Sequence, residues 1–171
     1  MAKKWSQQQY THSSLWVIIA ESILGQGNKS TEFYRMINPI EHTRTKDAAN
    51  KYKVEPYVIP ADIYGAGNLA GRGGWTWYTG SSSWFYKAGI EYILGLKIQN
   101  NELMLNPCIP KEWDEYTIRY KYGRSIYNIK VKNPNGKNTG VTSFKVNGEE
   151  VEEKSIKLAQ DGKIYEIEVE M

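Results

Sequence analysis

The spacing of hydrophobic residues changes once along the chain, and this change divides the sequence into two parts. Before residue 95, apolar residues recur at every third or fourth position, which is the period of a helix. We therefore expect helices at residues 13–24, 29–37, 46–52 and 82–94. After residue 95, short apolar runs alternate with polar positions between turn residues, which predicts strands. The predicted strands are residues 103–105, 116–122, 125–132, 141–146, 155–158 and 164–170.

The first predicted helix, residues 13–24, is apolar nearly all the way round. A helix of this kind is buried on most sides, yet the chain offers few segments that could cover it. We therefore expect the chain to be a piece of a larger fold. Gly25 and Gly27 end this helix, and Asn28 is the predicted N-cap of the next one. Residues 61–64 are predicted to form a single helical turn.

The second part of the sequence carries closely spaced turn signals. Gly123-Arg124 separates two alternating runs and predicts a hairpin. Asn147-Gly148 and Asp161-Gly162 are further turn pairs. The pattern predicts a β domain at residues 97–171, organised as a small antiparallel sheet or β-sandwich.

Glycine, aromatic and hydroxyl residues coincide at residues 71–84, Gly-Arg-Gly-Gly-Trp-Thr-Trp-Tyr-Thr-Gly-Ser-Ser-Ser-Trp. The glycines allow positive φ or close approach to a ligand, and flat aromatic rings suit the apolar faces of sugars. Thr79-Gly80-Ser81 precedes the amphipathic segment, so a helix N-terminus with free N–H groups is expected there. These features predict a site for a sugar together with a phosphate. The alternative is a loop that packs under a helix start and binds nothing.

Composition narrows the class of protein. The 171 residues are 40% hydrophobic and 24% charged, as in ordinary globular proteins, and six Trp and thirteen Tyr favour amphipathic ligands such as carbohydrate. A net charge of +3 is too small to indicate nucleic acid binding. The single cysteine, Cys108, cannot form an internal disulfide, so we expect a cytoplasmic protein. No membrane segment, signal peptide or metal-ligand spacing is present in the sequence.

Several motifs occur together in one order. They are Gly71 to Ser81, the run Gln9-Tyr10-Thr11-His12-Ser13-Ser14-Leu15-Trp16, then Asn38-Pro39-Ile40, Tyr52-Lys53-Val54-Glu55-Pro56-Tyr57-Val58 and Asn106-Pro107-Cys108-Ile109-Pro110. From about Gln7 to Asn133 the chain resembles the C-terminal part of glycoside hydrolase family 94, the cellobiose phosphorylase-like enzymes. The residues of these motifs are most similar to those of the β-1,2-glucan branch of the family, which includes cyclic β-1,2-glucan synthase and β-1,2-oligoglucan phosphorylase.

The resemblance implies a fold and a reaction. Residues 1–96 would be the last helices of an (α/α)6 barrel, followed by a small antiparallel β-sandwich domain at residues 97–171. The reaction would be inverting phosphorolysis or glucanosyl transfer of a β-glucoside. In phosphorolysis, phosphate attacks the anomeric carbon while an Asp general acid protonates the leaving oxygen. Inorganic phosphate would be a co-substrate, and no cofactor would be needed.

The resemblance also assigns residues. The family's phosphate-binding His falls on His12, and its Thr-Gly pair falls on Thr79 and Gly80. The general-acid Asp and the phosphate-binding Arg of the family belong to earlier helices, so we expect no catalytic residue in this chain and no activity of the chain alone. The family's usual Gly-Gly-Gln before the His, often after a Glu, is replaced here by Ser6-Gln7-Gln8-Gln9 after Trp5.

Five further residues are candidates for the sugar side of the site, and each has an alternative role. Trp75, Trp77 and Tyr78 could stack on sugar, although we expect at least one of them to lie in the core. Arg72 could contact phosphate or a sugar hydroxyl, or form a structural ion pair. Glu55 could accept a sugar hydroxyl or be structural. His12 itself could be only a helix-start residue, and Trp84 is expected in the core.

Three functional hypotheses remain open at this stage. The first is a C-terminal fragment of a carbohydrate-active enzyme that supplies part of the phosphate and sugar site. The second is a non-catalytic carbohydrate-binding or scaffold protein. The third is a fragment without function that self-associates through its apolar helix faces. The expected partners are a β-glucan or gluco-oligosaccharide, phosphate, and the missing N-terminal part of the enzyme or a second copy of the chain.

Overall fold

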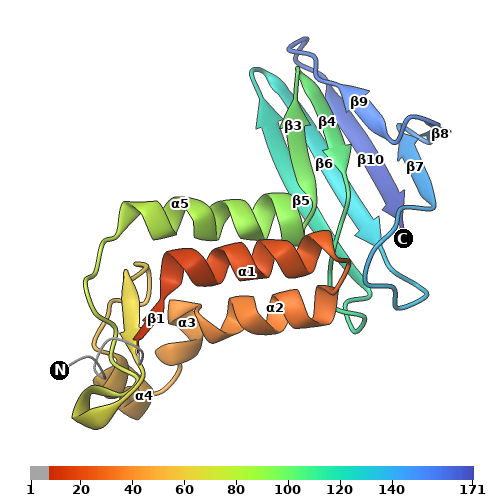
Figure 1. Cartoon of the computed structure of the whole chain (residues 1–171). Helices are drawn as coiled ribbons and strands as arrows, with labels where there is room; N and C mark the ends of the chain where they lie inside the picture. The colour runs from red at the N-terminus through yellow and green to blue at the C-terminus, as the bar shows by residue number, and fades with distance from the viewer. Residues whose placement is uncertain (1–7) are drawn as a thin grey trace. The chain divides into compact units, whose positions relative to one another are not determined.

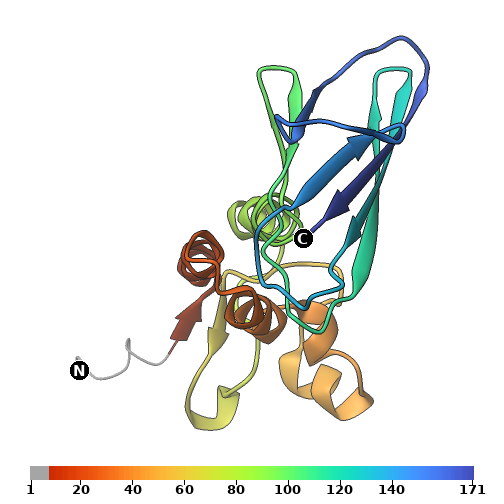
Figure 2. The same ribbon diagram turned by 90° about the vertical axis from the view of Figure 1, so that its right-hand side faces the viewer.

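The computed structural model describes residues 8–171, which form two compact units (Figures 1 and 2). The first unit contains the described residues up to Ala20 together with Thr31–Gly89, and the second contains Glu21–Ser30 and Ile90–Met171. Helices dominate the first and strands the second. The predicted order, helical part before β part, is therefore confirmed, whereas the predicted boundary after residue 96 stays a prediction. The atypical Trp5, Ser6 and Gln7 lie outside the described residues.

The four predicted helices are present with small shifts of their ends. The helices are α1 (Thr11–Ile23), α2 (Gly27–Met36), α3 (Pro39–His42), α4 (Lys46–Tyr52) and α5 (Thr79–Lys87). A short 3-10 turn, η1, covers Gly67–Leu69. The α-helix α5 ends seven residues before the predicted end, and Ala88–Ile93 continues as a π-helical segment, η2. Gly89 leaves room there for Tyr34, because the Tyr34 hydroxyl lies 2.8 Å from where a Cβ of residue 89 would stand.

Two local predictions are wrong, both because contacts between distant residues decide the structure. Asn28 lies inside α2 and does not cap it; its Oδ1 instead accepts a hydrogen bond from the backbone N–H of Lys111 (3.0 Å). Residues 61–64 form no helical turn. Strand β2 (Asp62–Tyr64) pairs there with β1 (Gln8–Tyr10) in an antiparallel two-stranded sheet.

Helix α1 is less buried than its apolar composition predicts. Leu15 and Ile18 are fully buried, whereas Trp16 is 55% and Val17 is 49% exposed. The described residues therefore cover one side of the helix and leave an apolar side in solvent. An exposed apolar side is a feature of helices that pack against further structure.

The second unit contains two sheets that share no strand. The strands are β3 (Leu96–Gln99), β4 (Glu102–Leu105), β5 (Glu115–Tyr122), β6 (Ser125–Lys132), β7 (Ser143–Val146), β8 (Glu149–Glu150), β9 (Ser155–Lys157) and β10 (Ile164–Glu170). The larger sheet has the order β5-β6-β10-β7-β8, and the smaller has the order β3-β4-β9. The six predicted strands are all present.

The larger sheet is mixed, so the prediction of a wholly antiparallel structure is wrong. Strands β6 and β10 are parallel neighbours, with Ile129 opposite Ile167 and Val131 opposite Val169. A parallel pair needs a long connection, and here residues 133–163 supply it through β7, β8 and β9. The alternating inward residues of both strands form the core of this unit.

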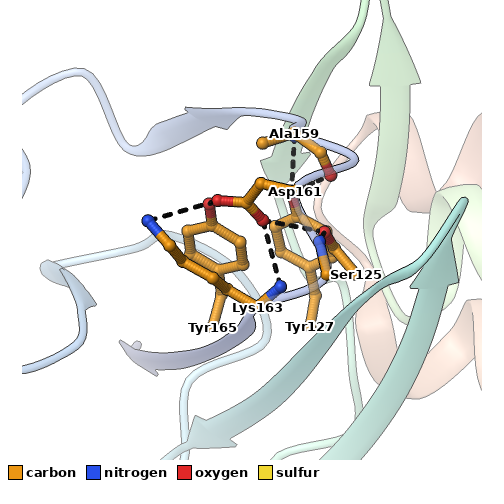
Figure 3. Close-up of polar contacts among 7 residues, drawn as sticks. Ser125, Tyr127, Ala159, Asp161, Lys163 and Tyr165 are labelled. Atoms are coloured by element: carbon orange, nitrogen blue, oxygen red, sulfur yellow. Dashed lines mark hydrogen bonds and ion pairs between the residues drawn. The ribbon is translucent and has the colours of Figure 1, made fainter.

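The turn before β10 is held by Asp161 (Figure 3). Its carboxylate accepts hydrogen bonds from Ser125 Oγ (3.0 Å), the Lys163 N–H (3.1 Å) and the Tyr165 hydroxyl (3.0 Å). The Tyr165 ring stacks on Tyr127 with centroids 4.8 Å apart. These hydrogen bonds, led by the backbone N–H of Lys163, lower the pKa of Asp161 to about 2. The charged carboxylate thereby joins the start of β10 to the start of β6.

We predict that Asp161→Asn lowers the stability of the chain at neutral pH and flattens its pH dependence in acid. Because the folded pKa of Asp161 lies below the ordinary value of 3.8, its contribution is complete above about pH 4 and is lost as the pH falls toward 2. Urea unfolding between pH 2 and 7 measures both effects. Asp114→Asn is the matched control, since Asp114 is exposed in the same unit. Parallel pH curves for the wild type and Asp161→Asn would contradict the role assigned to this carboxylate.

Backbone hydrogen bonds anchor the glycine-rich loop in the first unit. The N–H of Gly73 donates to the carbonyl of Tyr52 (2.9 Å), and the N–H of Gly74 donates to that of Asp62 (2.8 Å). Gly73 is buried, and a Cβ there would stand 2.2 Å from Cγ2 of the buried Val54. The loop can therefore adopt this position only because residue 73 is a glycine.

We predict that Gly73→Ala destabilises the chain by about 1–3 kcal/mol, the usual cost of overpacking a core. Gly80→Ala is the control, since its Cβ would meet no atom closer than 3.6 Å. Urea denaturation of the two variants gives the comparison. Equal stability of Gly73→Ala and the wild type would show that the loop moves away from Val54 without cost.

Candidate functional site

His12 and the start of α5 face each other although they are far apart in the sequence. His12 is the second residue of α1, and Thr79 and Gly80 are the first two residues of α5. A Cβ on Gly80 would lie 3.6 Å from His12 Nδ1. The structure thus brings together the three residues predicted to bind phosphate.

Aromatic rings surround His12. Its imidazole stacks on Tyr10 with centroids 6.0 Å apart and meets Trp16 edge-on at 5.1 Å. Trp84, one helical turn after Gly80, lies 5.9 Å away in a tilted arrangement. Trp84 is half-buried and lines this group, so the prediction that it lies in the core is wrong. The contacts of His12 within residues 8–171 include no carboxylate.

The start of α5 offers donors to an anion. The first N–H groups of a helix have no partner within it, and the helix dipole places partial positive charge beside them. Tyr78, the N-cap residue, makes no side-chain capping bond that would occupy these groups.

Two buried hydroxyls flank the site. Thr11 Oγ1 and Ser81 Oγ belong to fully buried residues, and neither has a hydrogen-bond partner within the described part of the chain. Thr11 precedes His12, and Ser81 follows Gly80. Buried hydroxyls normally have a partner, so these two residues, next in sequence to His12 and Gly80, each carry an unsatisfied buried hydroxyl.

The aromatic residues of the loop continue the row that begins at His12. The Tyr78 hydroxyl hydrogen-bonds that of Tyr10 (3.0 Å), and this bond raises the pKa of Tyr10. Trp75 lies 5.7 Å from the Tyr78 ring and is 74% exposed. Tyr78 links Trp75 to the surroundings of His12.

Trp77, Glu55 and Tyr57 form a separate group. The Trp77 indole N–H donates to Glu55 Oε1 (3.3 Å), and its ring meets Tyr57 edge-on at 6.1 Å. Trp77 has φ of +60° and Tyr57 is 75% exposed. A bulky residue at positive φ is strained, and such strain is concentrated at ligand-binding sites. None of Trp75, Trp77 and Tyr78 is buried, so the expectation that at least one lies in the core is wrong.

Arg72 belongs to neither group. Its side chain is exposed and makes no ion pair among residues 8–171, so the structural ion pair considered for it is not found there. Its backbone carbonyl accepts from the N–H of Tyr64 (2.9 Å). The guanidinium is thus held on the loop with its donors in solvent.

The hydrophobic pattern alone does not identify Tyr10, Trp16 and Tyr57 as parts of these groups. Tyr10 and Trp16 flank His12 in the Gln9–Trp16 motif, and Tyr57 follows Glu55-Pro56 in another motif. Their place in these motifs is the feature of the sequence that indicates a role in the site. Within residues 8–171, no three His, Cys, Asp or Glu side chains are placed to hold a metal ion. No helix in that part of the chain has the length and hydrophobicity required to span a bilayer.

Comparisons with known proteins agree with the motifs. Residues 3–95 match the catalytic domain of the glycosyl hydrolase 94 superfamily, and residues 96–152 match the C-terminal domain of glycosyl hydrolase family 65. The chain is 44% identical over 123 residues to the cyclic β-(1,2)-glucan synthase NdvB of Rhizobium meliloti (strain 1021), covering 72% of this chain and 4% of that protein. It is 35% identical over 144 residues to an N,N'-diacetylchitobiose phosphorylase of Vibrio furnissii, covering 84% of this chain and 18% of that protein.

A third relative, the solabiose phosphorylase of Paenibacillus borealis, is 27% identical over 163 residues, covering 95% of this chain and 21% of that protein. The chain therefore spans less than a quarter of the length of these relatives. The family match covers more than half of the chain and includes His12, Thr79 and Gly80. The chain belongs to the glycosyl hydrolase 94 superfamily.

Proposed function

We propose that this chain is the C-terminal part of a carbohydrate-active enzyme of the inverting β-glucoside phosphorylase or glucanosyltransferase type. Its helices would complete an (α/α)6 barrel, and its strands would form the β-sandwich domain that follows, with the domain boundary after residue 96. Inorganic phosphate would be the co-substrate and a β-glucan or gluco-oligosaccharide the sugar substrate. The family match and relatives named as phosphorylases and a glucan synthase support this class.

The observation that carries the proposal is the approach of His12 to the start of α5. A phosphate between them would accept hydrogen bonds from the imidazole and from the N–H groups of Thr79 and Gly80. The Thr79 hydroxyl, exposed in the first turn, would add another donor. Phosphate held in this way keeps one oxygen free to attack an anomeric carbon.

In this mechanism the protein positions the nucleophile and leaves proton transfer to another group. Phosphate is already an anion and needs no base to activate it, unlike the water of an inverting hydrolase. A general acid must protonate the leaving oxygen, and no carboxylate contacts His12 within residues 8–171. That acid would come from the remainder of the enzyme, so the chain alone would be inactive.

The aromatic groups would hold the sugar. Trp75 and Tyr78 adjoin His12 through Tyr10, so a sugar ring stacked on them would lie beside the proposed phosphate position. Trp77 and Glu55 would form a second contact, in which the Glu55 carboxylate accepts a sugar hydroxyl. Arg72, with its donors in solvent, would contact phosphate or a hydroxyl at the rim.

A non-catalytic carbohydrate-binding role is the second candidate. The exposure of Trp75 (74%), Trp77 (63%) and Tyr57 (75%) favours it, because exposed aromatic rings can bind glucan without phosphate. The two candidates differ in what His12 does. In the enzyme His12 binds phosphate, and in the alternative it does not.

We predict that the chain binds inorganic phosphate and that His12→Ala weakens this binding by about tenfold, the loss of about one charge-assisted hydrogen bond. Calorimetric titration measures the affinity. Trp16 and Trp84 lie against His12, so tryptophan fluorescence provides a second readout. His42→Ala is the matched control, because His42 stacks on Tyr52 and bonds the Met36 carbonyl.

In the same titration, Gly80→Ala should weaken phosphate binding while the chain stays folded. The added methyl group fits beside His12 at 3.6 Å but fills the space between the imidazole and the helix start. Equal phosphate affinity of the wild type and both variants would contradict the proposed site. Glucan binding that ignores phosphate and His12→Ala would favour the non-catalytic alternative.

A further inference from the structure

The second unit contains a cavity with a volume of about 410 Å³. This volume lies in the range of sites for small ligands. The cavity is lined by polar residues from several segments, among them Ser22, Glu91, Tyr92, Lys97, Asn106 and Thr139. None of its lining residues belongs to the groups around His12 or Trp77, so a ligand bound here would occupy a second site.

The charges in the cavity favour a neutral ligand. Glu91 and Lys97 bring one negative and one positive group to the same lining. The Lys97 ammonium lies 4.7 Å from the centre of the Tyr92 ring, and this cation–π contact holds it at the cavity. A small ion would be attracted by one of these groups and repelled by the other, so the two charges of the lining select neither an anion nor a cation.

The hydrogen-bonding groups of the cavity match a ligand with many hydroxyls. A carboxylate only accepts hydrogen bonds and an ammonium only donates them, whereas the Asn106 amide and the Thr139 hydroxyl do both. A hydroxyl group can satisfy each of these, because it donates and accepts at once. A ligand with several adjacent hydroxyls would therefore use the whole set.

Apolar side chains lie beside these polar groups. Ile23 and Leu24 line the cavity and remain 72% and 70% exposed. A pyranose ring has apolar C–H faces as well as hydroxyls at its edge. Burying such a face against Ile23 and Leu24 would remove apolar surface from water on both partners.

The backbone that supplies Glu91 and Tyr92 is unusual. Both residues belong to the π-helical segment Ala88–Ile93. π-Helical turns are rare and are found frequently at functional sites. The irregular segment places two lining residues of different chemistry at one cavity.

From this combination we infer that the cavity binds a neutral sugar unit, such as one glucose residue of a gluco-oligosaccharide. The choice of glucose rests on the proposed function, whereas the choice of a neutral polyol rests on the lining alone. A sugar bound here would tether the substrate at a second point. Tethering raises the effective concentration of the chain ends of a long glucan at the enzyme.

The test uses the full chain with Trp75→Ala, Trp77→Ala and Tyr78→Ala, which removes from the measurement the rings proposed to hold sugar at the first site. Saturation-transfer NMR with methyl β-D-glucopyranoside reports binding and its affinity. We expect Lys97→Met to weaken binding by about tenfold, as for the loss of a hydrogen bond to a charged group. Glu91→Gln should also weaken binding of the glucoside. Lys121→Met and Glu149→Gln, at exposed positions of the same unit, are the matched controls.

Amide shifts in ¹⁵N-labelled chain locate the ligand independently of the variants. We expect saturable shifts at Gly25, Lys97 and Thr139 on addition of the glucoside. Binding that is unchanged in Lys97→Met, or shifts confined to other residues, would overturn the inference. A response of these amides to inorganic phosphate and none to the glucoside would overturn it as well. The phosphate titration of His12→Ala uses none of these residues, so failure of one proposal is distinguishable from failure of the other.

Discussion

The pairing of the segment around Ala61 with two other segments is the constraint on which the candidate site depends. The Ala61 carbonyl accepts from the N–H of Thr11 (2.9 Å), and the Ala61 N–H donates to the carbonyl of Trp75 (2.7 Å). One residue thereby joins the start of α1 to the glycine-rich loop. In the residues that follow Ala61, strand β2 pairs with β1 along one edge, and Ile63 forms an isolated β-bridge with Gly73 along the other edge. His12 and Thr79 each follow closely on a paired segment, so these bonds set how the two helix starts meet.

This arrangement explains the residues that the loop requires. The close pairing around β2 admits no side chain at Gly73, where a Cβ would strike Val54. The loop then reaches Trp77 at positive φ, and the bond from its indole to Glu55 holds that strained residue. With their backbone held in this way, Trp75 and Trp77 present their rings to solvent. Exposed aromatic rings on an anchored backbone lose little entropy when they bind a ligand.

The sequence predicts those parts of the fold that depend on local pattern. Strands β6 and β10 have the predicted bounds, because alternation over seven or eight residues is a strong signal. Helix α4 also matches, with Thr45 as its N-cap. Strand β2 has only three residues and is defined by its partners, so no pattern within it could distinguish it from a helical turn. The parallel pairing of β6 and β10 likewise depends on the path of the connection and not on either strand.

The candidate site likewise has features that the sequence pattern predicts and features that it does not. The glycines, the aromatic rings and the helix start at Thr79 follow from residue types, but the position of His12 opposite Gly80 came only from the motif resemblance. Periodicity also predicted that Trp16 and Val17 would be buried, because it reports the character of a helix and not the presence of a neighbour. Both are half-exposed. The sequence indicates that few segments of the chain can cover this helix, and the structure identifies Trp16 and Val17 as residues of its uncovered side.

The exposed side of α1 bears on how strong the phosphate site can be. Trp16, which is 55% exposed, contacts His12 edge-on, so the apolar side in solvent adjoins the candidate site. Electrostatic attraction between a phosphate and its donors is weaker in water than in a site from which water is excluded. Structure that packs on Trp16 and Val17 would exclude water near His12 and strengthen the same hydrogen bonds without adding a residue to them. If the chain is part of the proposed enzyme, the whole enzyme should bind phosphate more tightly than this chain does, and the difference combines this burial with the contribution of the phosphate-binding Arg expected outside the chain.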